Sequence, residues 1–307
     1  MERKTWMGLA LAGWACAAHA GDGAGINFVA MGDWGWNGHQ NQKELAKAVG
    51  EEAESIDIDF VVSLGDNFQV NGVRSVQDPL WRLSFEDVYT QPVLEKNWYA
   101  VLGNHDYHGN TQAQIEYTRI SRRWNLPSHW YAVKQKVSKD ADLEMFFLDT
   151  PPFQSKYWAK REAYPDLERQ DTAAQLRWID SALSTSKAKW KLVFGHHPLY
   201  SGGSKHGAET GDMQRLFAER FEKYGVTAYF AGHDHHMEHV APKGYHFQQF
   251  VDGAHSVRSA TPGPDSRFCK AVPGFATVQV REDSLVVRFL DGKRYQLYRA
   301  AVAPRKP

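Results

Sequence analysis

Five apolar segments of the chain end in the same way, at a glycine that is followed by an Asp, Asn or His side chain. The segments are five or six residues long and rich in β-branched and aromatic residues, a composition typical of β-strands. Because they are almost continuously apolar, we predict strands that are buried on both faces of a sheet. They are Ile26–Met31, Phe60–Leu64, Trp98–Leu102, Trp190–Phe194 and Thr227–Ala231, followed by Gly32-Asp33, Gly65-Asp66, Gly103-Asn104-His105, Gly195-His196 and Gly232-His233.

Segments of helix-type composition lie between several of these strands, at Gln40–Glu54, Gln170–Leu183 and Gly211–Tyr224. This alternation predicts an α/β fold in which some strands pair in parallel. Ligands of such sheets bind at the carboxyl ends of the strands, so we expect the five polar clusters to face one shared crevice. A glycine at each end allows a sharp turn and a close approach of the backbone to a bound group. One such strand end alone is an ordinary turn, whereas five together favour a functional site.

The rest of the chain predicts a second sheet. Residues Ser128–Thr150 have the pattern of two strands, and Pro151–Arg169, rich in Pro, Tyr, Trp and charge, is interpreted as an excursion from the sheet. From Met237 onward short strand-like runs recur, including Phe275–Val280 and Ser284–Leu290, and they indicate a second sheet packed on the first. No internal domain boundary is evident.

The N-terminus has the pattern of a signal peptide. Arg3 and Lys4 give it a basic start, Trp6–Ala18 is a short run of apolar and small residues, and small residues precede a cleavage site after Ala20. The run is too short to span a bilayer comfortably. We therefore predict a signal peptide at 1–20, a single catalytic domain at 21–307, a periplasmic or secreted protein, and no transmembrane anchor after cleavage.

Composition narrows the range of partners. The 307 residues carry 36 basic and 36 acidic side chains, a formal net charge of zero, so no overall positive field attracts nucleic acid and no nucleic-acid binding is predicted. Cleavage would remove Cys16 and leave Cys269 as the single cysteine, without an internal disulfide. Trp14 and Ala15 make a poor lipid-attachment motif in front of Cys16.

The side chains at the strand ends form a set of oxygen and nitrogen donors without thiolates. Such a set suits Zn, Mn, Fe or Mg rather than a sulfur cluster. Two metals about 3.5–4 Å apart that share a carboxylate form the arrangement used in phosphate-ester displacement. Asp66, which follows the second strand, is the candidate for the shared carboxylate, and nearby histidines are candidates for protonating the leaving oxygen.

Five motifs, in this order along the chain, closely resemble those of the calcineurin-like metallophosphoesterases, and most of all their tartrate-resistant, purple acid phosphatase branch. The resemblance covers about Phe28–His235 and implies two packed mixed β-sheets flanked by helices, an α-β-β-α sandwich. The motifs are Gly32-Asp33-Trp34-Gly35, Gly65-Asp66-Asn67-Phe68, Gly103-Asn104-His105-Asp106, Gly195-His196-His197-Pro198 and Gly232-His233-Asp234-His235.

The resemblance also implies roles for individual residues. His105 matches a residue that contacts the phosphoryl group, and His206 matches a second histidine near the leaving group, although the loop before it is one residue longer here. Both are predicted catalytic residues. The implied metal ligands are Asp33, Asp66 and His235 for the first metal, and Asn104, His196 and His233 for the second, with Asp66 shared by both.

Neighbours of these ligands are predicted to act indirectly or not at all. His197 follows a predicted ligand, and one of two adjacent side chains usually points away. Asp106 and Asp234 either orient the histidine ligands by accepting their second N–H or stabilise the turns.

Gln69 is the main departure from the purple acid phosphatase pattern. In that branch a tyrosine stands three residues after the shared aspartate, binds Fe(III) as phenolate and gives the colour. The neutral amide oxygen of Gln69 supplies no such charge, so we predict a colourless or weakly coloured site with two divalent metals (Fe, Mn or Zn), Fe(III) being less favoured. Gln69 itself binds a metal weakly, bonds a metal-bound water, or points elsewhere.

The leading functional prediction is an acid-phosphatase-like hydrolase that cleaves phosphate monoesters, with metal-bound hydroxide as the nucleophile and a small phosphorylated molecule or a phosphoprotein as substrate. A phosphodiesterase or nucleotide pyrophosphatase is the alternative, because similar metal sites support both reactions. A binding homologue that has lost activity is a third hypothesis, for which Gln69 is the only hint.

Overall fold

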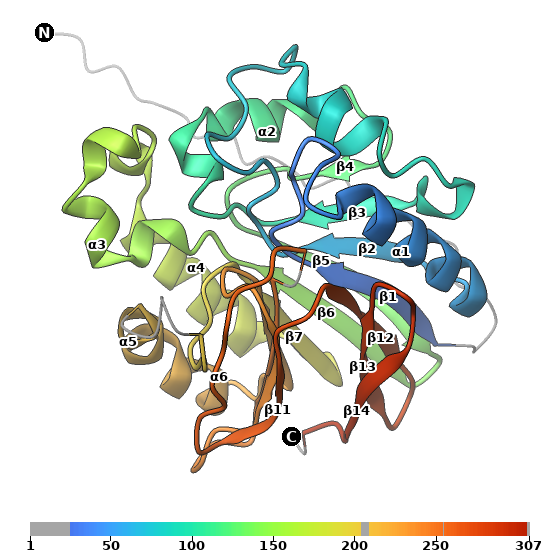
Figure 1. Cartoon of the computed structure of the whole chain (residues 1–307). Coiled ribbons are helices and arrows are strands. Elements are labelled where there is room, and N and C mark those ends of the chain that lie inside the picture. The colour runs from blue at the N-terminus through green and yellow to red at the C-terminus, as the bar shows by residue number, and fades with distance from the viewer. Residues whose placement is uncertain (1–24, 204–208, 254, 306–307) are drawn as a thin grey trace, which may run out of the picture.

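The computed structural model describes residues 25–203, 209–253 and 255–305, and within them two seven-stranded sheets face each other. Helices cover the outer face of each sheet (Figure 1). This is the predicted sandwich of two mixed sheets flanked by helices. The predicted leader 1–20 lies outside the described residues.

The first sheet contains the first three predicted strands. β1 (Ile26–Met31), β2 (Phe60–Ser63), β3 (Asn97–Ala100) and β4 (Trp124–Asn125) run in parallel, with Phe28 opposite Phe60 across the first pair. Along the other edge of β1, three C-terminal strands add in antiparallel order: β12 (Gly274–Val280), β13 (Leu285–Asp291) and β14 (Gln296–Val302).

The position of these C-terminal strands corrects one prediction. Phe275–Val280 and Ser284–Leu290 were expected in a second sheet, but β12 and β13 belong to the first sheet together with β1. The physical reason is that β1 would otherwise present an unpaired edge, which β12 satisfies along five residue pairs.

The second sheet combines the other two predicted strands with later and intervening segments. β6 (Ala141–Phe147), β7 (Trp190–Phe194), β8 (Ala228–Ala231) and β10 (Gln248–Asp252) are parallel neighbours. The antiparallel strands are β5 (Tyr131–Ser138) at one edge, and β9 (Met237–Val240) and β11 (Ser266–Lys270) at the other.

Aromatic side chains fill the space between the sheets. Phe28 of β1 stacks on Phe60 of β2 at 4.9 Å and meets Phe194 of β7 and Phe230 of β8 edge-on at 6.1 and 6.3 Å. Full burial of such rings is the main apolar contribution to stability in a core. These rings hold the two sheets face to face. The carboxyl ends of β1, β2, β3, β7 and β8 then lie together at one side of the sandwich.

The predicted helices are present with small shifts of their ends. α1 (Gln42–Ile56) contacts β1 and β12 of the first sheet. α4 (Thr172–Thr185) packs on the outer face of the second sheet through Ile179 and Leu183. The third predicted helix is α5 (Thr210–Met213), a π turn (Gln214–Ala218) and α6 (Glu219–Lys223) in succession. The shorter elements are α2 (Thr111–Tyr117), α3 (Ser155–Trp158), and 3₁₀ or π turns at Trp81–Glu86, Pro92–Leu94, Asp106–His108, Pro151–Phe153, Arg161–Ala163 and Leu167–Arg169.

The excursion (residues 151–169) contains α3 and three short turns and forms a lobe at the edge of the molecule (Figure 1). Across the described residues, no helix combines the length and the apolar character needed to cross a membrane.

A buried histidine links the two sheets and predicts acid-sensitive stability. His239 of β9 bonds Tyr298 of β14 and Gln248 of β10, both at 2.9 Å, and burial lowers its pKa to about 4. In the unfolded chain the His239 ring takes up a proton near pH 6.5, whereas in the folded protein it stays neutral until about pH 4. The free energy of unfolding therefore falls as the pH drops from 6.5 to 4, by about 3 kcal/mol for this group. Urea unfolding between pH 7 and 4 should show a shallower decline in His239→Gln.

The exposed His39 supplies a matched control, since His39→Gln should leave the pH dependence as in wild type. Buried His255, whose pKa burial lowers to about 3, keeps part of the acid slope in every variant. Identical pH dependence in wild type and His239→Gln would contradict the prediction.

Candidate metal centre

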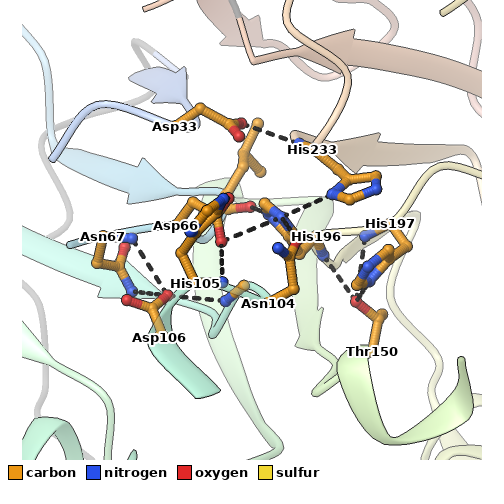
Figure 2. A network of polar contacts seen from close by, with 12 residues as sticks. Asp33, Asp66, Asn67, Asn104, His105, Asp106, Thr150, His196, His197 and His233 are labelled. Carbon is orange, nitrogen blue, oxygen red and sulfur yellow. Dashed lines mark hydrogen bonds and ion pairs between the residues drawn. The ribbon is translucent and has the colours of Figure 1, made fainter. Parts of the chain in front are cut away.

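The polar residues at the five strand ends converge on one place between the sheets (Figure 2). From the first sheet, Asp33, Asp66 and Asn104 follow β1, β2 and β3. From the second sheet, His196 and His233 follow β7 and β8. All five side chains are buried. The prediction of one shared crevice is confirmed in this sense, although the strands belong to two facing sheets rather than to one.

The donors predicted for the second metal lie around His196. Its Nε2 atom is 3.2 Å from Asn104 Oδ1, 3.2 Å from His233 Nδ1 and 3.4 Å from Asp66 Oδ1. The other ring nitrogen, Nδ1, lies 2.8 Å from the carbonyl oxygen of Leu64 and donates to it. Because this bond places the proton on Nδ1, the lone pair of Nε2 points toward the other predicted metal ligands. A neutral histidine binds a metal through such a lone pair.

The donors predicted for the first metal lie around Asp33. Its Oδ1 atom is 3.1 Å from His235 Nε2, and its Oδ2 atom accepts the backbone N–H of His233 at 2.9 Å. Ligand atoms of Asp33, Asp66 and His196 all lie within 4.8 Å of one another.

Two carboxylate oxygens at this place show that the residues fit a cation. Asp33 Oδ1 and Asp66 Oδ2 are buried and accept no well-aligned hydrogen bond from the described residues, although His235 Nε2 lies 3.1 Å from the first oxygen and His105 Nε2 lies 3.9 Å from the second. A buried anionic oxygen without a donor is costly unless a positive charge compensates it. Carboxylate, amide and imidazole donors are also the set that Zn, Mn and Fe accept. The residues present therefore suit a bound metal pair.

Strained backbone accompanies three of these donors. Asp33, Asp66 and His233 have φ values of 60°, 51° and 66°, in the left-handed region that residues with a Cβ atom seldom adopt. Each such residue costs about 1–3 kcal/mol and persists where the surrounding structure enforces it, often at functional sites.

The glycines before and beside these donors are required by close contacts. A Cβ atom on Gly103 would lie 2.2 Å from Asp66 Oδ1, one on Gly232 would lie 2.8 Å from Asp33 Oδ2, and one on Gly65 would lie 2.6 Å from His196 Nδ1. The repeated glycine in the sequence pattern therefore makes room for the neighbouring donor as well as for the turn.

Comparison with known proteins agrees with this geometry. The model of the calcineurin-like phosphoesterase family matches residues 26–237. The chain belongs to this family. It is 37% identical to purple acid phosphatase 3 of Arabidopsis thaliana over 280 residues, which cover 87% of this chain and 74% of that protein. It is 32% identical to tartrate-resistant acid phosphatase type 5 of Homo sapiens over 310 residues, covering 93% of each chain.

Solved structures support the fold of this phosphoesterase. GAP50, the anchor in the inner membrane complex of Plasmodium, superposes with a TM-score of 0.77 at 24% identity, covering 92% of this chain and 90% of that one. The purple acid phosphatase PPD1 from yellow lupin gives a TM-score of 0.63 at 16% identity, covering 93% of this chain and 55% of that one. With the sequence relatives, the family assignment makes the protein a metal-dependent phosphoric-ester hydrolase, in a family that implies a binuclear metal centre.

His105, a predicted catalytic residue, lies at the accessible edge of the phosphoesterase site. Its backbone N–H donates to Asp66 Oδ1 at 2.8 Å, and its ring Nε2 is 3.9 Å from Asp66 Oδ2. The ring Nδ1 is 3.2 Å from the carbonyl oxygen of Val70, a β-branched residue held at φ 74°. The ring is one-third exposed, unlike the buried donors.

Asp106 and Gln69 also lie next to the site. Asp106 accepts hydrogen bonds from the backbone N–H groups of Gly103 (2.8 Å), Asn67 and Phe68 (both 3.1 Å). It therefore joins the loops after β2 and β3, which agrees with the prediction that it stabilises the turns. Burial and the nearby Asp66 carboxylate raise the pKa of Asp106 to about 6. The Gln69 side chain is buried, and its Nε2 atom has no partner among the described residues.

Two histidine predictions have different outcomes. His197, expected to point away, instead lies beside the proposed ligands, with a ring nitrogen within 4.8 Å of ligand atoms of His196 and His233. Both of its ring nitrogens have hydrogen-bond partners, since Nδ1 is 2.9 Å from Thr150 Oγ1 and Nε2 is 2.8 Å from the Tyr157 hydroxyl (Figure 2 shows the Thr150 contact). His206 lies outside the described residues, and its catalytic role stays a prediction.

The sequence did not reveal a carboxylate beside His233. Glu209 Oε2 lies 2.9 Å from His233 Nε2, and Lys156 forms an ion pair with the same carboxylate. Burial opposes ionisation of Glu209, but His233 and Lys156 outweigh it and lower its pKa to about 2. Glu209 follows no strand and stands in no motif with the ligands, so no local signal marked it.

Proposed function

We propose that this protein is an acid-phosphatase-like enzyme that hydrolyses phosphate monoesters at a pair of metal ions. The observation that carries the proposal is the convergence of six side chains with oxygen and nitrogen ligand atoms, two of which are carboxylates with a buried oxygen that accepts no well-aligned hydrogen bond from the described residues. The 30–37% identity to purple and tartrate-resistant acid phosphatases supports the monoester assignment.

In the proposed site, Asp33, Asp66 and His235 hold the first metal, while Asn104, His196 and His233 hold the second, with Asp66 shared. When bound, such a pair supplies Lewis-acid stabilisation of the phosphoryl oxygens and an activated water. Because Gln69 brings no negative charge, we propose two divalent ions, Fe, Mn or Zn.

The protein's own side chains complete the reaction as follows. Burial alone would raise the pKa of Asp66, but His196 and His105 lower it well below its usual range, so the carboxylate stays ionised. The Nδ1–H of His105 donates to Val70 O. In the ring protonated at both nitrogens, the Nε2–H is then free to bond the phosphoryl group or to pass its proton to the leaving oxygen. His206 is proposed as the second histidine near the leaving group.

The test compares two esters on the purified mature protein, after its metal content has been determined. Turnover of p-nitrophenyl phosphate well above that of bis-p-nitrophenyl phosphate, with about two metals per chain, supports the proposal. Preference for the bis-ester would instead indicate a phosphodiesterase or nucleotide pyrophosphatase. A folded protein that stays inactive after metal is supplied would indicate a binding homologue, and a strong visible phenolate-to-iron band would contradict the divalent site.

Replacement of His105 should separate chemistry from metal binding. In His105→Gln we expect kcat for p-nitrophenyl phosphate to fall about 10²–10⁴-fold, because a general acid or phosphoryl contact is lost, while both metals stay bound. Metal analysis and steady-state kinetics on the same sample check both parts. His108→Gln, on the same short turn, is the control and should keep kcat near wild type. An unchanged kcat in His105→Gln would remove His105 from the mechanism.

We further propose export through cleavage of residues 1–20, with 21–307 as a single catalytic domain acting in the periplasm or outside the cell. N-terminal sequencing of the protein recovered from the expressing cells should begin at residue 21. A mature chain that still begins at Met1 and stays in the cytoplasm would contradict this proposal.

A further inference from the structure

The excursion (residues 151–169) reaches the segment that leads into α5. Ser155 N and Oγ both donate to Asp212 Oδ2, at 2.8 and 2.7 Å. One residue later, Lys156 pairs with Glu209, and the Tyr157 hydroxyl is 3.3 Å from Glu209 Oε2. Three successive residues of α3 thus contact two acidic residues at the start of α5, and Glu209 is the nearer of the two to the proposed metal centre.

Glu209 connects α3 to a proposed metal ligand. It is 9% exposed and His233 is 3% exposed, so their 2.9 Å contact is shielded from water. His233 Nδ1 lies on the opposite side of the ring, 3.2 Å from His196 Nε2. If Nε2 carries the proton and donates it to Glu209, the Nδ1 lone pair is directed at the second metal position.

The hydrogen bonds among the described residues support this direction. Thr150 Oγ1 accepts the backbone N–H groups of His196 and His197, so its own proton goes to His197 Nδ1. His197 Nε2–H then donates to the Tyr157 oxygen, and the Tyr157 proton goes to Glu209 Oε2. Lys156 on Oε1, together with Tyr157 and His233 on Oε2, then all donate to Glu209, as an ionised carboxylate requires.

We propose that Glu209 is a positioning residue for the second metal, which fixes the tautomer and ring orientation of His233, and that Lys156 and Tyr157 of the excursion hold Glu209 in place. The excursion thereby sets the affinity of one metal position and not of the other. The inference rests on the proposed function through the assignment of His233 as a ligand. Loss of a hydrogen-bond partner of this kind lowers metal affinity about 10–100-fold.

The experiment titrates Zn²⁺ or Mn²⁺ into chelator-treated protein by calorimetry, with metal analysis of the products. In Glu209→Ala, we expect one of the two binding events to lose about 10–100-fold in affinity and the other to stay as in wild type. Glu209→Gln should recover part of the loss, because its amide oxygen still accepts the His233 N–H. Lys156→Met should cause a smaller loss in the same event.

Matched controls come from the same excursion. Glu168 is exposed and pairs with the exposed Arg161, so Glu168→Gln should bind both metals as wild type does, and so should Lys160→Met. Far-ultraviolet circular dichroism and the melting temperature of each chelated variant test the fold. Activity of Glu209→Ala should return at saturating metal, as a lost positioning contact predicts and a lost catalytic group does not.

The possible results separate the two proposals. Two metals bound by wild type, with unchanged affinities in Glu209→Ala, would overturn the positioning role and leave the phosphatase proposal intact. Equal weakening of both events would also overturn it, because the effect would then be a general one. A wild type that binds fewer than two metals would overturn both. If Glu209→Ala fails to fold, Lys156→Met decides, since the Lys156 side chain is 44% exposed and the variant keeps the Glu209 carboxylate in the chain.

Discussion

Asp66→Asn should lose both metals and at least about 10³-fold in kcat/KM for p-nitrophenyl phosphate. Loss of a residue that only supports a ligand costs about 10–100-fold, and Asp66 is proposed to be shared by the two ions. Its Oδ2 atom has no hydrogen-bond donor among the described residues, so the neutral amide would place an uncharged group where the metals require an anion. Metal analysis and steady-state kinetics of the purified variant provide the measurement.

The substitution is conservative for the fold, which makes the result interpretable. Asp66 adopts φ 51°, a conformation that Asn tolerates at least as well as Asp, and the Asn oxygen can still accept the His105 N–H. Asp57→Asn is the matched control, because Asp57 also has φ 50° but lies exposed at the end of α1. Full metal content in Asp66→Asn would show that the shared ligand has been wrongly assigned.

Gly103→Ala should lower activity about 100-fold without replacing any proposed ligand. Its new Cβ atom would lie 2.2 Å from Asp66 Oδ1 and 2.3 Å from Asp66 N, so the Asp66 side chain and backbone must both shift. Overpacking of this kind costs about 1–3 kcal/mol in stability, and a ligand displaced by even 1 Å costs about 100-fold in rate. Thermal unfolding, metal content and kcat/KM together measure the effect.

Gly211→Ala is the corresponding control, because a Cβ atom at Gly211 would meet no atom within 4 Å among the described residues beyond its chain neighbours and its own helix backbone. Alanine is the better helix former, so this variant should keep its metals and unfold at the same temperature or slightly higher. Normal metal content and rate in Gly103→Ala would mean that the loop after β3 does not approach Asp66 as described.

The close contacts behind these two predictions explain why the sequence alone could locate the centre of the site. Each proposed ligand follows the end of a buried strand or lies two residues beyond one, and each strand ends at a glycine that the packing requires. In each case, the predicted ligand and the glycine that makes room for its neighbours are therefore adjacent in the sequence. Asp33, Asp66, Asn104, His196 and His233 are all marked in this way.

Residues that depend on tertiary packing left no such mark. Glu209 and Lys156 come from two segments 53 residues apart that follow no strand, and they meet only because the excursion folds back on the start of α5. The sequence also could not show which sheet contains β12 and β13, because their strand-like pattern fits either sheet. What decided it was the free edge of β1, a property of the assembled fold.

The order of the proposed ligands along the chain has a consequence for how the enzyme obtains its metals. Each proposed metal position draws ligands from both sheets, and the hydrogen bond from the His233 backbone N–H to Asp33 Oδ2 joins residues 200 positions apart. Neither position exists until the chain has been synthesised past His233 and both sheets have met. A chain exported before it folds would therefore carry no metal with it. The ions available where the polypeptide finishes folding, and not those of the compartment where it is translated, would decide which metals it keeps.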